Sequence, residues 1–194
     1  MSDGAANTIA FQGLPGAYSE LACKQVYPRM RTLPTHAFDD TFAAVRRGRA
    51  RLAMIPIENS VAGRVADIHR LMPLSGLHII AEHFMRVNHH LLAPKNATMN
   101  TIRIVRSHVH ALGQCGKFIR KHRLKPVVHA DTAGAARHVA EVKDKTLAAV
   151  ASRLAADIHG LLILKPDVED ADHNVTRFLI MSREPDDAVN DGAR

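Results

Sequence analysis

The sequence predicts an α/β protein built as two lobes of mainly parallel sheet flanked by helices. Its 194 residues are 46% hydrophobic, which suits one large domain or two small lobes around a shared cleft. Short apolar runs alternate with segments of helical period along the whole chain, as they do in βαβ units. One long extended stretch, residues 77–93, interrupts this alternation and is interpreted as a crossover between the lobes.

Before the crossover, three βα units are predicted. A Gly-Leu-Pro-Gly turn separates the first strand from its helix, and Asp39 is expected to cap the second helix, which stops at Gly48. The elements predicted here are a strand at 9–11, a helix at 17–27, a strand at 32–37, a helix at 39–48, a strand at 52–57 and a helix at 61–71.

After the crossover, a second βα series is predicted. The residues beyond Ser182 are small or acidic, so they cannot bury apolar area and are expected to form a loose tail. The elements predicted here are strands at 102–105, 127–129, 147–150, 161–164 and 177–181, with helices at 108–122, 132–142 and 151–158.

The composition narrows the classes of partner. Lys and Arg total 26 against 19 Asp and Glu, a formal charge of +7, which favours anionic partners. Aromatic residues make up only 4% and Trp is absent, so the stacking platforms of single-strand nucleic-acid binders would be hard to build. The basic runs at 46–51 and 117–125 are interpreted as solvated helix faces. We therefore expect a small anionic ligand and no nucleic acid.

The remaining composition indicates a cytoplasmic protein. Cys23 and Cys115 lie far apart and in no CxxC spacing, which favours neither a metal site nor a disulfide and suits a reducing compartment. Residues 1–7 have no secretory character, and no apolar run approaches the roughly 18 residues of a membrane span. We expect no membrane association and no bound metal.

Two candidate segments follow strands of the first series. Residues 13–20 place glycines before a helix start, where backbone N–H groups can hold an anion; taken alone, the segment is more typical of an ordinary tight turn than of a ligand site. Residues 56–63 lie at the carboxyl end of a strand, the usual ligand edge of an α/β sheet. In the alternative interpretation, Ser60 is a helix cap and Glu58 a solvated carboxylate.

Two more candidate segments lie in the second half of the chain. In residues 107–115, Ser107 precedes a helix and Gln114 lies about two turns along it, while His108 and His110 are expected to point apart, against a shared metal. In residues 172–178, a threonine stands beside an arginine. The pair could bind a carboxylate or a departing hydroxide. Alternatively, the arginine could form a structural ion pair.

Taken in this order, the four segments resemble the catalytic domain of prephenate dehydratase, the enzyme of phenylalanine biosynthesis that converts prephenate to phenylpyruvate. The resemblance covers residues 9–182 and is most specific at residues 55–60 with Gly63, and at residues 174–178, whose Thr-Arg-Phe core is the family signature. Relatives often carry Pro and Gln where Val109 and His110 stand. Many continue into a regulatory ACT domain, which we expect this chain to lack.

The resemblance implies a fold like that of type 2 periplasmic binding proteins, with the active site in the cleft between the lobes. Lobe one would comprise residues 1–82 and 174–194, and lobe two residues 83–173. The implied activity is that of a carbon–oxygen lyase, a hydro-lyase that expels the ring hydroxyl and carbon dioxide together. Aromatisation drives this reaction, so it needs no cofactor or metal. Relatives form dimers, and we expect a homo-oligomer of that kind.

The resemblance also implies residue roles. Thr176 is the expected hydroxyl donor to the leaving group, with Glu58 or bound water behind it, Asn59 is expected to assist, and Arg177 is the expected partner of a carboxylate. The substrate contacts implied by the matched segments are Gly16, Ala17, Tyr18, Ser19, Asn59, Ser60, Ser107, His108, Gln114, Asn174 and Phe178.

Three alternatives stay open at this stage. Arogenate differs from prephenate by an amino group in place of a keto group, and no residue decides between these substrates. A non-catalytic small-anion-binding module would share the fold. The group that finally protonates the leaving hydroxide is also undecided.

Overall fold

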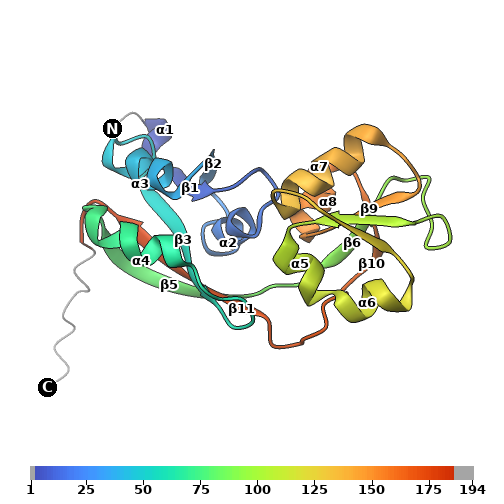
Figure 1. Cartoon of the computed structure of the whole chain (residues 1–194). Helices are drawn as coiled ribbons and strands as arrows, with labels where there is room; N and C mark the ends of the chain where they lie inside the picture. The colour runs from blue at the N-terminus through green and yellow to red at the C-terminus, as the bar shows by residue number, and fades with distance from the viewer. Residues whose placement is uncertain (1–2, 186–194) are drawn as a thin grey trace, which may run out of the picture.

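A computed structural model describes residues 3–185, which form two lobes joined by two chain crossings (Figure 1). Each lobe contains one sheet with helices packed against it, so the predicted α/β class is confirmed. Most of the expected loose tail after Ser182 lies outside the described residues. Within residues 3–185, no helix is both long enough and apolar enough to span a membrane.

The first lobe is built on a sheet of strand order β2-β1-β3-β11-β5, with the short β4 paired to β3. Its elements are α1 (Asp3–Ala6), β1 (Thr8–Gln12), α2 (Tyr18–Val26), β2 (Arg31–Thr35), α3 (Phe38–Arg46), β3 (Leu52–Asn59), β4 (Gly63–Arg64), α4 (Ala66–Leu71), a 3-10 turn (Met72–Leu74), β5 (His78–Arg86) and β11 (Val175–Ser182).

The second lobe has the strand order β10-β6-β9-β7-β8. Its elements are β6 (His90–Ala93), β7 (Ile104–Ser107), α5 (Val109–Gln114), α6 (Gly116–Lys121), β8 (Lys125–Val128), α7 (Thr132–Val142), β9 (Leu147–Ala151), α8 (Arg153–His159) and β10 (Leu162–Lys165).

The sheets are mixed, so the expectation of mainly parallel sheets is wrong. Strand β1 runs parallel to β2 and β3, but β11 runs antiparallel to both β3 and β5. In the second lobe β7 is parallel to β8 and β9, whereas β6 is antiparallel to β9 and β10. The reason is connectivity: β5 leads out of the first lobe and β11 returns to it, and an apolar run carries no sign of its direction.

The stretch interpreted as a crossover is mostly regular strand. Strand β5 stays paired with β11 as far as Arg86, which lies opposite Val175, so the lobe boundary expected after residue 82 falls inside a strand. The crossing itself is confined to residues 87–89. It runs beside the returning chain, where the Val87 N–H donates to the Asn174 carbonyl at 2.8 Å.

Several predicted helix ends shift for local reasons. The helix expected at 61–71 starts only at Ala66, because the two residues of β4 first pair back onto β3. Asp39 does not cap α3; the Asp40 carboxylate instead accepts the Ala37 N–H at 3.3 Å. The single helix expected at 108–122 is broken at Cys115 into α5 and α6. By contrast, α7 has the predicted bounds, with Asp131 as its cap.

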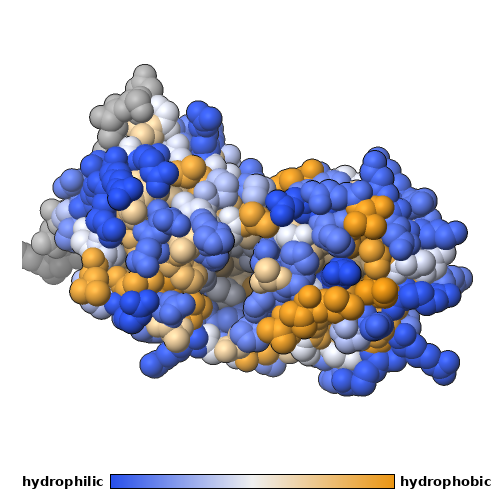
Figure 2. Space-filling view, turned by 45° about the horizontal axis from the view of Figure 1, so that its top comes forward, coloured by the Kyte–Doolittle hydropathy of each residue, from blue (hydrophilic) through white to orange (hydrophobic). Residues whose placement is uncertain are grey.

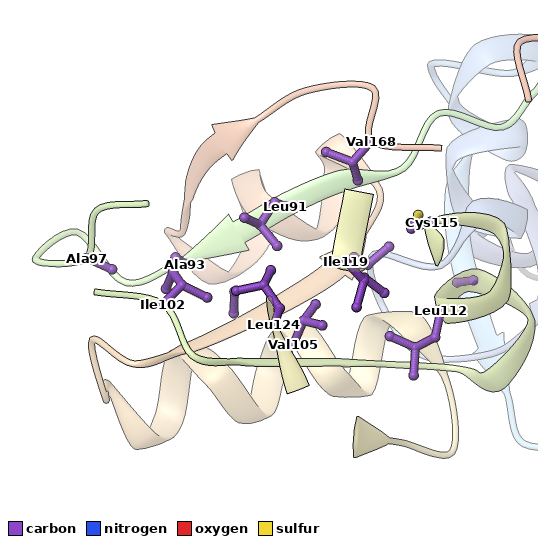
Figure 3. Packing of buried hydrophobic residues seen from close by; sticks show 13 residues of the cluster. Leu91, Ala93, Ala97, Ile102, Val105, Leu112, Cys115, Ile119, Leu124 and Val168 are labelled. Carbon is purple, nitrogen blue, oxygen red and sulfur yellow. The ribbon is translucent and has the colours of Figure 1, made fainter. Parts of the chain in front are cut away.

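Separate clusters of buried apolar side chains hold the lobes. In the first lobe, α2 covers one face of the sheet and α3 and α4 cover the other. In the second lobe, buried residues from α5, α6, β6 and β7 meet on one face of the sheet, among them Leu91, Val105 and Ile119 (Figure 3). Each buried cluster stays within one lobe, and the surface is hollowed between the two lobes (Figure 2).

Candidate active site

A β-bulge in β3 brings two of the predicted residues to one face of the sheet. Strand β11 pairs Arg177 with Glu58 and Phe178 with Pro56, so Ile57 is an extra residue in β3. An inserted residue reverses the side on which later side chains point. Asn59 therefore lies on the same face as Thr176, its register partner. Its side-chain Nδ2 donates to the Thr176 Oγ1 at 2.9 Å.

Asn59 and Thr176 belong to a chain of hydrogen bonds that passes through both crossings between the lobes. The amide Nδ2 of Asn59 also donates to Asn174 at 2.7 Å, and Asn174 Nδ2 donates to Gln114 at 3.1 Å. Gln114 Oε1 lies 2.7 Å from His89 Nε2. We call this set the hinge network; its members are Tyr18, Asn59, His89, Gln114, Asn174 and Thr176.

The far end of the hinge network lies on α2 in the first lobe. The Tyr18 hydroxyl lies 2.7 Å from His89 Nδ1 and 2.9 Å from the Asn88 carbonyl, and its single proton can be donated to only one of these two atoms at a time. Burial is the main cause that lowers the pKa of His89 and raises the pKa of Tyr18 well above its ordinary value. Both groups are therefore neutral near pH 7.

A cavity of about 350 Å³ lies beside the hinge network between the lobes. The first lobe contributes apolar contacts from the turn after β3, and the second lobe contributes α5. Gln114 and Asn174 are the predicted site residues on its wall, whereas Thr176 is not among the lining residues. The lining residues are Val61, Ala62, Val109, His110, Gly113, Gln114, Glu169, Asp170, Ala171 and Asn174.

The acidic members of this wall have internal partners. Glu169 accepts the His89 N–H at 2.9 Å, and Asp170 accepts the Lys117 N–H with both oxygens at 3.0 Å. No Lys or Arg among residues 3–185 lines the cavity. An anionic ligand there would meet neutral donors rather than a fixed cation.

Glu58 and Arg177 lie on the opposite face of the same two strands. Arg177 Nε donates to Glu82 at 2.7 Å and its NH1 to Glu58 at 3.3 Å, and these hydrogen bonds raise the pKa of Arg177. Adjacent residues of a strand point to opposite faces. The expected relay from Glu58 to Thr176 is therefore not possible in this arrangement, and Arg177 forms the structural ion pair that was the alternative.

The expected anion site at the start of α2 is filled from within the chain. The Gly16 N–H donates to the Glu20 carboxylate at 2.7 Å, and the Ala17 N–H donates to Leu14 at 3.0 Å. The Gly16 carbonyl accepts the Ser152 hydroxyl at 2.6 Å. Gly16 also has φ +93°, and a Cβ there would lie 2.8 Å from the Ala155 Cα. This turn therefore joins the two lobes, and its Gly16 and Ala17 N–H groups already have acceptors within the chain.

Three other expected contacts are buried in the protein, and a fourth, Ser60, is exposed. Ser107 is fully buried and its hydroxyl donates to the Val150 carbonyl at 2.6 Å. Phe178 is 1% exposed within the core under α2, and Ser19 is buried on α2. Ser60 does not cap a helix; its hydroxyl donates to the His173 carbonyl at 2.6 Å. Ser107, Phe178 and Ser19 are therefore structural in this arrangement, whereas Ser60 is exposed and lines a small pocket beside Asn59.

His108 is the residue before α5 and caps it, with Nδ1 accepting the His110 N–H at 3.4 Å. The two rings were expected to point apart, but their centroids are 5.0 Å apart in an edge-to-face contact, because His108 stands outside the helix. Among residues 3–185, no group of three or more His, Cys, Asp or Glu side chains could hold a metal ion.

Sequence analysis missed His89 as a member of the site. Neither His89 nor the adjacent His90 was among the candidate site residues. Their position between two extended runs was the available signal, because a buried polar residue at a lobe crossing requires hydrogen-bond partners.

The chain matches the family model described as prephenate dehydratase over residues 9–186. It is 54% identical over 177 residues to a bifunctional N-acyl-homoserine lactone acylase/prephenate dehydratase of Komagataeibacter europaeus, covering 91% of this chain and 63% of that protein. It is 41% identical over 185 residues to arogenate dehydratase/prephenate dehydratase 2 of Arabidopsis thaliana, covering 95% of this chain and 49% of that protein.

Two solved structures agree with this match. GqqA, described as a novel type of quorum quenching acylase, superposes with a TM-score of 0.87 at 53% identity, covering 92% of this chain and 64% of that one. The prephenate dehydratase of Arthrobacter aurescens in complex with L-Phe gives a TM-score of 0.85 at 30% identity, covering 93% and 63%. The chain thus spans between about half and two thirds of the length of these relatives.

Proposed function

The chain belongs to the prephenate dehydratase family, and we propose that it converts prephenate to phenylpyruvate, carbon dioxide and water, with Thr176 as the proton donor to the leaving hydroxyl. The family assignment supports the class of reaction. The hydrogen bonds around Thr176 support the choice of donor.

The observation that carries the proposal is the direction of the Asn59 hydrogen bond. Asn59 Oδ1 accepts the N–H groups of Val61 at 3.0 Å and Ala62 at 2.8 Å, so its Nδ2 must face Thr176. Nδ2 can only donate. The Thr176 oxygen is therefore an acceptor at 2.9 Å, and its own proton is donated to no described residue. A hydroxyl held in this way is free to donate to a substrate.

The reaction balances with one proton. The bond between the ring and its carboxylate breaks, carbon dioxide leaves, and the electron pair enters the ring. The bond between the ring and its hydroxyl breaks, and that electron pair leaves on oxygen. The Thr176 O–H protonates the departing oxygen to give water and recovers a proton from solvent. The prephenate dianion and one proton thus yield the phenylpyruvate monoanion, carbon dioxide and water.

Gln114 supplies a second neutral donor in this proposal. Its Oε1 accepts from His89 and Asn174, and its Nε2 has no partner among the described residues. Nε2 carries two N–H groups on the cavity wall. We propose that Nε2 donates to a carboxylate or keto oxygen of the substrate and so orients the substrate relative to Thr176.

Product formation tests the proposal. Purified protein is given prephenate and arogenate separately, and phenylpyruvate and phenylalanine are measured with time. We expect phenylpyruvate from prephenate at the higher kcat/KM. Turnover of arogenate alone would move the assignment to arogenate dehydratase, and turnover of neither would leave an anion-binding module.

A second candidate is hydrolysis of N-acyl-homoserine lactones, because the relative with 54% identity carries that activity in its name. Amide hydrolysis by a hydroxyl nucleophile needs a base within hydrogen-bond reach. The Ser107 hydroxyl faces a carbonyl and the Thr176 hydroxyl faces an amide, and neither has a His or carboxylate partner in residues 3–185. The same preparation, incubated with an N-acyl-homoserine lactone, should release no homoserine lactone above background if the dehydratase assignment is complete.

A further inference from the structure

We infer that His89 is a positioning residue for the dehydratase site: as a neutral imidazole protonated on Nε2, it fixes the amide orientation of Gln114 and, through it, the donor that faces the substrate. The inference rests on the proposed function for its kinetic consequences. Its structural content, the His89 tautomer, can be measured without any turnover.

The direction of every bond in the hinge network follows from two backbone amides. Val61 and Ala62 fix Asn59 Oδ1 as an acceptor, so Asn59 Nδ2 donates and the facing atom of Asn174 must be Oδ1. The Nδ2 of Asn174 then donates to Gln114, whose facing atom must be Oε1. An oxygen that faces a ring nitrogen 2.7 Å away requires a proton on that nitrogen.

His89 Nε2 is therefore the protonated nitrogen. Its other nitrogen, Nδ1, lies 2.7 Å from the Tyr18 hydroxyl. In the inferred tautomer the single Tyr18 proton goes to this unprotonated Nδ1 and not to the Asn88 carbonyl 2.9 Å away. His89 is 2% exposed. The charged groups nearest to it are Glu169, which accepts its backbone N–H at 2.9 Å, and Asp167, which lies 3.9 Å from the neighbouring His90. The ring is thus held between two lobes with one defined donor and one defined acceptor.

The consequence concerns Gln114. An isolated amide side chain can rotate its oxygen and nitrogen between two positions of nearly the same shape. The His89 Nε2–H stabilises only the orientation that turns Oε1 toward the hinge and leaves the two Nε2–H groups for the cavity. Without this proton the amide can flip and present an acceptor to an anionic substrate, which would repel it.

Two substitutions distinguish the roles of the two ring nitrogens of His89. His89→Gln places an amide nitrogen near the former Nε2 and keeps a donor for Gln114, whereas His89→Asn keeps a polar group near Nδ1 and loses that donor. Misplacing a reacting group by a small distance costs about 10- to 100-fold in rate. We expect His89→Asn to lower kcat/KM by about this factor and His89→Gln to stay within about threefold of the wild type.

A double-mutant cycle identifies the partner. If His89 acts through Gln114, His89→Asn added to Gln114→Ala should lower kcat/KM by less than about twofold. A purely structural role would instead give an additive loss and a fall in melting temperature that follows it. His90→Asn is the matched control: His90 is 6% exposed and its Nδ1 accepts the Asp167 N–H at 3.2 Å, outside the hinge network. It should keep the wild-type kcat.

The tautomer is measured directly with imidazole-labelled protein by nitrogen–proton correlation NMR near neutral pH. We expect His89 to show a protonated Nε2 and an unprotonated Nδ1. An Nδ1–H tautomer or an imidazolium would overturn the inference, and so would a His89→Asn enzyme within about twofold of wild-type kcat/KM. Should the wild type turn over neither substrate, the proposed function fails, and the NMR result alone decides the role of His89 in orienting Gln114.

Discussion

The two faces of the β3–β11 pair differ in chemistry at neighbouring positions. On the face that α2 covers, Asn59 and Thr176 are neutral, half-buried and joined to the hinge network. On the other face, Glu58, Arg177 and Glu82 form ion pairs whose side chains are 39% to 47% exposed. The comparison teaches that adjacent residues of one sequence motif serve different purposes: the α2 face is organised to leave a hydroxyl proton free, and the other face satisfies its own charges.

The largest effect should follow from removing the hydroxyl on the α2 face. Thr176→Ala should lower kcat by at least about 100-fold, because a positioned proton donor is worth about 100- to 10,000-fold, and should change KM only a few-fold. Thr176→Ser, which keeps the hydroxyl, should recover much of the rate. Kinetics at saturating and limiting prephenate check both parameters.

The control for this variant is its folded state, measured by circular dichroism and thermal melting in the same preparation. A well-folded Thr176→Ala enzyme that keeps more than about a third of the wild-type kcat would exclude Thr176 as a general acid.

A smaller effect should follow from reversing the Asn59 hydrogen bond. Asn59→Asp keeps the oxygen for Val61 and Ala62 but replaces the donor with an acceptor, so the Thr176 proton would turn toward Asp and away from the substrate. Loss of this donor leaves buried acceptors unpaired, at about 1 to 3 kcal/mol, and kcat should fall by about 10- to 100-fold. Equal kcat values for the wild-type and Asn59→Asp enzymes would contradict the proposed direction of the hydrogen bond.

A third test asks whether the substrate binds on the side of the β3–β11 strand pair that faces the cavity. Gly113 lines the cavity, and a Cβ there meets nothing within 4 Å. Gly113→Phe should fill the cavity and raise KM for prephenate by about tenfold or more, since burying part of one ring is worth at least 1.4 kcal/mol. Gly113→Ala is the matched control and should change KM little. An unchanged KM for the phenylalanine variant would locate binding elsewhere.

The smallest effect concerns pH and the buried histidines of the hinge. Burial lowers the pKa of His89 and His90 from the ordinary 6.5, so below that value the unfolded chain binds more protons than the folded one. The stability present above pH 6.5 should therefore decline as pH falls through this window. Denaturant melts at several pH values between about 7.5 and 5.5 measure it. A free energy of unfolding that rises on acidification would contradict this assignment.

Sequence analysis predicted most elements and both specific motifs, because these depend on local patterns. The apolar run of β9 and the bounds of α7 are examples. It could not predict that β11 runs antiparallel to β3, because the direction of a strand depends on connectivity. The β-bulge at Ile57 could not be predicted either. Simple alternation along β3 would place the Asn59 side chain on the face opposite Thr176.

The candidate site was predicted only in part for a similar reason. Thr176, Asn59, Gln114 and Asn174 come together as the motifs indicate. Whether a polar side chain faces a cavity or a carbonyl depends on tertiary packing. Ser107, for example, precedes a helix as predicted, but its hydroxyl donates to the Val150 carbonyl inside the protein.

The most direct test of the central claim compares neighbouring residues on opposite faces of one strand. Thr176→Val removes a hydroxyl at nearly constant volume, and Arg177→Met removes a charge at similar length. The kcat for prephenate is measured for both variants in parallel with the wild type. The account predicts that the Thr176→Val enzyme is slower than the Arg177→Met enzyme by about 100-fold or more. Equal values, or a greater loss for Arg177→Met, would contradict it.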